Sequence, residues 1–198
     1  QRKHESRILL LGEQKTSKNN FRRVLMGEEA EEDDFNPPTE LTYKTEITGL
    51  PMLEQKNELN IFDLSCEEKH QDLIKSYYSG KGIIIFTVNA LIPSYFSKGI
   101  EEAKRLFLEI HEKNNLVAFA VVVFNGFVLT YKNHKEENFS KLDDLKKEIE
   151  NNGATLISPA DSDNFFFSIT LKYSDKTKTG FDKLEAALGI ASSLDLFS

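Results

Sequence analysis

Apolar residues along the chain gather into short continuous runs separated by longer stretches with helical spacing. The segments 8–11, 82–88 and 116–124 are almost entirely apolar, which is typical of strands buried on both faces of a sheet. Residues 41–47 instead alternate between apolar and polar, as expected of a strand with one solvated face. A further strand is predicted over 59–64, and we expect these last two strands to pair antiparallel.

Five segments carry apolar residues three or four positions apart, which predicts amphipathic helices. They lie near residues 21–25, 73–78, 96–110, 139–149 and 181–188, and the last strand is predicted over 164–171. Because long helices separate most of the buried strands, we expect parallel strands joined by right-handed crossovers. The sequence therefore predicts an α/β fold: a three-layer sandwich around a mostly parallel six-stranded sheet with one antiparallel edge strand.

Composition and charge are those of a soluble globular protein. The 198 residues are 39% hydrophobic and 29% charged, which suits a single domain over 1–198 with a core over about 7–190. The net charge of −7 argues against nucleic-acid binding, and no apolar run approaches the ~20 residues that span a bilayer. The single cysteine, Cys66, excludes an internal disulfide and suits a reducing compartment. We expect a cytoplasmic protein, with an organellar or cytoskeletal assembly left open.

The segment LLLGEQKTSKNNF, residues 9–21, partly matches a phosphate-binding loop. That loop needs a glycine, four residues, Gly-Lys and then Ser or Thr. Gly12 and Lys18 have this spacing, whereas Ser17 replaces the second glycine and Asn19 replaces the hydroxyl residue. In such a loop, backbone N–H groups and a helix N-terminus hold the anion and the lysine neutralises its charge. The alternative for this segment alone is a polar turn that caps a helix.

Three other stretches carry a family resemblance. PPTELTY (37–43) looks like the switch I segment of small GTPases, and VVVFN (121–125) resembles the strand that delivers their guanine-reading asparagine. Residues 62–90 are similar, nearly position for position, to the Arf-like segment from the Walker-B aspartate through switch II. With the order of elements, these stretches resemble the G domain of the Ras superfamily, most closely its Arf-like branch.

The resemblance implies a magnesium site at Asn19, Thr39 and Asp63. Asp63 aligns with the acid that holds the metal through water, Thr39 with the switch I threonine, and Asn19 with the hydroxyl residue. The longer amide side chain of Asn19 would strain the coordination. The alternative for Thr39 is a strand-entry residue that follows two prolines.

The same resemblance implies that the nucleotide site is altered. Cys66 stands at the position of the glycine that senses the γ-phosphate, and Glu67 at that of the glutamine that orients the attacking water. Val128 replaces the aspartate that accepts hydrogen bonds from guanine, so a site built for those bonds loses selectivity. The candidate nucleotide-binding residues, as remains of such a site, are Gly12, Ser17, Lys18, Asn19 and Asn125.

Altered motifs on an intact apolar framework favour a pseudo-GTPase, an inactive Arf-like domain with no catalytic residue and no cofactor. We expect it to bind protein partners, as a scaffold subunit of a larger assembly, through the former switch face. The candidate partner-binding residues are Thr39, Leu41, Tyr43, Ile47, Cys66, Glu67, Tyr77 and Tyr78, with core positions as the alternative for the two last. The alternative function is a divergent switch that binds GTP or GDP with Mg²⁺ and hydrolyses GTP very slowly or not at all. Peripheral membrane association is left open.

Overall fold

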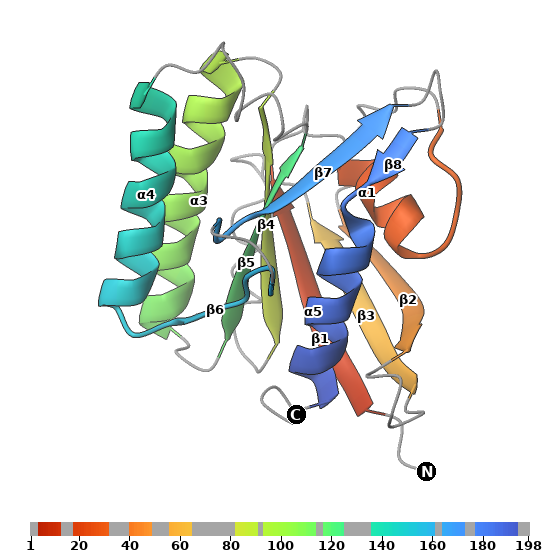
Figure 1. Cartoon of the computed structure of the whole chain (residues 1–198). Coiled ribbons are helices and arrows are strands. Elements are labelled where there is room, and N and C mark those ends of the chain that lie inside the picture. The colour runs from red at the N-terminus through yellow and green to blue at the C-terminus, as the bar shows by residue number, and fades with distance from the viewer. Residues whose placement is uncertain are drawn as a thin grey trace.

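A computed structural model describes residues 4–12, 18–31, 40–48, 56–64, 82–90, 93–113, 117–124, 136–160, 164–172 and 177–193. Strands and helices alternate along most of this chain (Figure 1). The strands are β1 (His4–Gly12), β2 (Glu40–Thr48), β3 (Lys56–Leu64), β4 (Ile83–Asn89), β5 (Ala118–Phe124), β6 (Thr155–Leu156), β7 (Phe167–Lys172) and β8 (Thr177–Thr179). The helices are α1 (Lys18–Leu25), α3 (Pro93–Lys113), α4 (Glu136–Asn151) and α5 (Phe181–Ser193).

The strands form one sheet in the order β2-β3-β1-β4-β5-β7-β8, with β6 beside β5. β1 is parallel to both of its neighbours, β3 and β4, whereas β2 is antiparallel to β3 at the sheet edge. The predicted class, a mostly parallel α/β sheet with an antiparallel edge strand, is confirmed. Within the described residues the sheet has eight strands instead of the predicted six. One of the additional strands, β8, pairs antiparallel with β7 at the opposite edge.

The continuous apolar runs are explained by helices on both faces of the sheet (Figure 1). Successive residues of a strand point to opposite faces. Leu9 and Leu11 therefore belong to a core shared with α3 and α4, whereas Ile8 and Leu10 belong to a second core shared with α1 and α5. Each face of β1 is covered, so no position in this run favours a polar residue.

Three phenylalanines hold α1 against the sheet. The ring centroid of Phe21 in α1 lies 5.7 Å from that of Phe124 in β5 and 5.7 Å from that of Phe181 in α5. All three side chains are buried, and aromatic pairs at this spacing add to the free energy of burial. The packing fixes α1 close to the carboxyl ends of the strands.

On α5, we expect Glu185→Gln to raise the melting temperature by about 1–2 °C at pH 7. Burial, and to a lesser degree the charge of Asp182, raises the pKa of the Glu185 carboxyl above its usual range. A raised folded-state pKa means that stability falls as the pH rises through the unfolded and then the folded pKa. The gain should therefore vanish at low pH, where both states are protonated. Thermal unfolding across pH tests this, with the exposed Asp143→Asn on α4 as control. A lower melting temperature of Glu185→Gln at pH 7 would contradict it.

Candidate functional site

Three charged side chains meet at the carboxyl ends of β1 and β3. Lys18 is the first residue of α1, Arg22 lies one turn later, and Asp63 is the second-last residue of β3. The Lys18 Nζ lies 3.0 Å from the Asp63 Oδ1. The Arg22 Nε donates a hydrogen bond of 3.2 Å to the Asp63 Oδ2. These three residues are called the Lys18–Asp63–Arg22 cluster below.

The cluster is removed from solvent. Asp63 is 0% exposed, and Lys18 and Arg22 are each 4% exposed. Charged side chains are almost never buried to this extent unless they are paired. Each carboxylate oxygen faces one cation, so the cluster is a buried ionic link between α1 and β3.

Local sequence and strand register together build this link. In the parallel pairing of β1 with β3, Asp63 lies beside Leu10, so it shares the face that α1 covers. Lys18 and Arg22 are four residues apart and so lie on one face of the helix. Phe21 and Leu25, on the same side of α1, are buried in the core.

Gly12 ends β1 in close contact with β4. It lies opposite Thr87, whose hydroxyl donates a hydrogen bond of 3.0 Å to the backbone oxygen of Leu11. A Cβ on Gly12 would lie only 1.8 Å from the Thr87 Oγ1 and 2.9 Å from its backbone oxygen. Strand packing therefore requires a glycine here, and a role of Gly12 in nucleotide binding stays a prediction.

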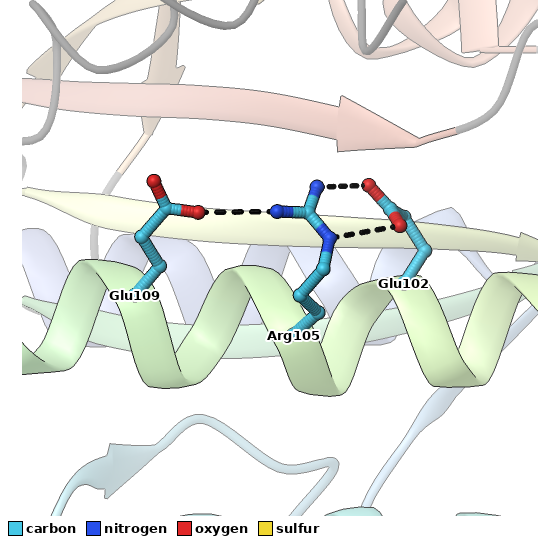
Figure 2. A network of polar contacts seen from close by, with 3 residues as sticks. All are labelled: Glu102, Arg105 and Glu109. Carbon is cyan, nitrogen blue, oxygen red and sulfur yellow. Dashed lines mark hydrogen bonds and ion pairs between the residues drawn. The ribbon is translucent and has the colours of Figure 1, made fainter. Parts of the chain in front are cut away.

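A second charged network lies on α3 (Figure 2). Arg105 Nη1 donates to Glu109 over 3.1 Å, and its Nε and Nη2 both donate to Glu102. The Arg105 side chain is 45% exposed. Ion pairs in such solvated positions contribute little stability, so this network is a surface feature and differs from the buried cluster.

No model of a known protein family and no curated protein matches the sequence. Among solved structures, the chain is similar to that of Methanosarcina barkeri Roco2 RocCORdC bound to GDP. The TM-score is 0.63 at 13% identity, over 99% of this chain and 50% of that chain. The chain has a P-loop GTPase-like fold. It spans half the length of the chain it matches, and at this identity the similarity concerns the fold alone.

The family resemblance in the sequence implies a magnesium ion near Asp63, and the described side chains around this carboxylate do not fit one. Both oxygens of the carboxylate already contact cations, at 3.0 and 3.2 Å. A divalent ion here, even one held through water, would be repelled by two fixed positive charges. Asn19, the predicted metal ligand on α1, is buried. In the described part of the chain, no group of three or more His, Cys, Asp or Glu side chains is arranged to hold a metal.

Three predicted partner-binding residues lie in β2, and its register places them. Leu41, Tyr43 and Ile47 lie opposite Asp63, Ile61 and Asn57 of β3. The pairing places all three residues in the edge strand, antiparallel to β3. Their role in partner binding stays a prediction.

The remaining predicted site residues lie outside the described residues. They are Ser17, Thr39, Cys66, Glu67, Tyr77, Tyr78 and Asn125. The helix predicted near 73–78 lies outside them as well. Across the ranges that the structure does describe, no helix is long and apolar enough to cross a membrane.

Arg22 was not predicted from the sequence. Its spacing of four residues from Lys18 was a signal that the two side chains share a helix face. Arg22 is buried because Asp63 of β3 provides a counter-ion for it.

Proposed function

We propose that this chain is a pseudo-GTPase: an inactive GTPase-like domain, of Arf-like type, that serves as a protein-binding or scaffold subunit. The Lys18–Asp63–Arg22 cluster is the observation that carries the proposal. In an active site of this fold, the lysine neutralises phosphates and the aspartate supports magnesium. In this chain Lys18 and Asp63 contact each other, with Arg22 added to the carboxylate.

Departures elsewhere in the nucleotide motifs support the same proposal. Ser17, Glu67 and Val128 stand where the resemblance implies a glycine, a glutamine and an aspartate. The buried framework of β1, β4 and β5 is complete. A domain that has an intact hydrophobic core but altered catalytic residues is suited to a binding role.

The proposed partner surface is the former switch face, which the family resemblance assigns to residues 39–47 and 66–78, together with the edge of the sheet at β2. In the described part of the chain, β2 is the terminal strand of the sheet and pairs with β3. An edge strand can add a strand from a partner through main-chain hydrogen bonds. This surface suits a protein partner within a multi-subunit complex.

One isolation tests the proposal with two readouts. The tagged chain is purified from native extract in magnesium, sized, denatured and analysed for released nucleotide by chromatography. We expect it to elute with partners, well above the 22.6 kDa of the single chain, and to release no stoichiometric GDP or GTP. An active small GTPase purified in the same way is the control. Elution as a lone monomer would contradict the scaffold role, and stoichiometric nucleotide would contradict the pseudo-GTPase.

The second candidate is a divergent nucleotide-dependent switch. The spacing of Gly12 and Lys18 favours it, as does the similarity in fold to a protein bound to GDP. For this function, the isolated protein would contain GDP or GTP, and Lys18→Ala would lose it. The same chromatography therefore separates the two candidates.

A further inference from the structure

Arg22 contacts the carboxylate to which the family resemblance assigns a magnesium ion. Its Nε is 3.2 Å from the Asp63 Oδ2, on the opposite oxygen from Lys18. The three side chains of the cluster bring two positive charges to one carboxylate. We infer that the Arg22 guanidinium takes the place of magnesium, so that this site works without a divalent ion. The inference deepens the proposal above and rests on its interpretation of the same site.

The helix holds this guanidinium in position. Phe21 and Leu25, on either side of Arg22 along α1, are buried in the core, and Arg22 itself is 4% exposed. A side chain so enclosed cannot leave the carboxylate without exposing core residues to water. Magnesium exchanges with solvent, whereas this positive charge is permanently bound to the chain.

Arg23, the next residue of α1, provides a matched comparison for Arg22. Arg23 pairs with Glu31 at 3.1 Å, and these two side chains are 21% and 62% exposed. The same helix thus carries one arginine paired with the buried carboxylate of Asp63 and one, partly buried, paired with the exposed carboxylate of Glu31. Only the first competes with a metal ion for Asp63.

The experiment measures the melting temperature in EDTA and in about 10 mM MgCl₂ at matched ionic strength. We expect magnesium to shift the wild-type protein by less than about 1 °C. Arg22→Gln, which removes the charge and keeps most of the length, should melt lower in EDTA and gain about 3 °C or more from magnesium. Arg22→Lys, which keeps the charge, and Arg23→Gln, which leaves the contacts of Asp63 with Lys18 and Arg22 in place, should both show no gain in melting temperature from magnesium.

Magnesium stabilisation of the wild-type protein, or a folded Arg22→Gln that does not respond, would overturn the inference. Electron paramagnetic resonance of Mn²⁺ provides a second test. The wild-type protein should leave the signal of free Mn²⁺ unchanged, and a bound fraction that Asp63→Asn abolishes would also overturn the inference. If the wild-type protein contained nucleotide but its melting temperature did not respond to magnesium, the pseudo-GTPase proposal would be rejected and the inference about Arg22 would stand. Failure of the proposed function can therefore be told apart from failure of this inference.

Discussion

Replacement of Asp63 with asparagine is expected to lower the free energy of unfolding by about 3–5 kcal/mol. The carboxylate is 0% exposed and is the counter-ion of both Lys18 and Arg22. Asparagine keeps the shape and removes the charge, so two buried cations remain close together without this counter-ion. Urea denaturation at neutral pH measures this decrease. An unchanged slope of the free energy of unfolding against urea concentration would show that the native state is intact.

Glu31→Gln is the matched control for this prediction. Glu31 also binds an arginine of α1, at 3.1 Å from Arg23, but its side chain is 62% exposed. A solvated pair of this kind contributes at most about 1 kcal/mol. If Asp63→Asn cost no more than Glu31→Gln, the cluster would not be the ionic link that joins α1 to β3.

Gly180→Ala is expected to cost about 2–5 kcal/mol, for two separate reasons. Gly180 joins β8 to α5 with a φ of +91°, a left-handed conformation that an alanine adopts only with strain. In addition, the new Cβ would lie 2.1 Å from the backbone oxygen of Ser168 in β7. Backbone in a paired strand moves only at the expense of its hydrogen bonds, so we expect a drop in the urea midpoint.

Gly153→Ala separates the two causes. Gly153 follows α4 with a φ of +68°, and a Cβ there would meet nothing within 4 Å. Gly153→Ala should therefore lower the free energy of unfolding only through the strained backbone conformation, by about 1–2 kcal/mol. Equal losses at the two glycines would show that the close approach of Gly180 to β7 adds nothing to stability.

Most of the fold could be predicted because the buried strands have a strong pattern. The runs in β1, β4 and β5 are short and apolar on both faces, which is typical of strands in a sheet covered on both sides. β8 could not be predicted in this way. Its sequence is the polar tripeptide Thr-Lys-Thr, with no apolar pattern. It forms a strand because its backbone pairs antiparallel with β7 at the edge of the sheet.

The candidate site was predictable only where a motif exists. Gly12 and Lys18 have the spacing of a phosphate-binding loop, and Asp63 lies in a segment that resembles the Walker-B region of Arf-like proteins, whereas Arg22 matches no motif. Its partner is 41 residues away in sequence, and their contact depends on the parallel pairing of β1 with β3. The pairing of Leu41 with Asp63 and of Tyr43 with Ile61 depends in the same way on register, which alternation alone does not determine.

The central position of β1 determines when the chain can fold during synthesis. β1 leaves the ribosome first, but its two neighbours end only at Leu64 and Asn89. Until the second of them has emerged, the apolar residues of β1 have no completed sheet to enter and are available to chaperones. Lys18 and Arg22 also emerge well before Asp63 and stay hydrated until it arrives. Folding of this domain is therefore expected to be late in synthesis, because the strands that pair with β1 come from residues far along the chain.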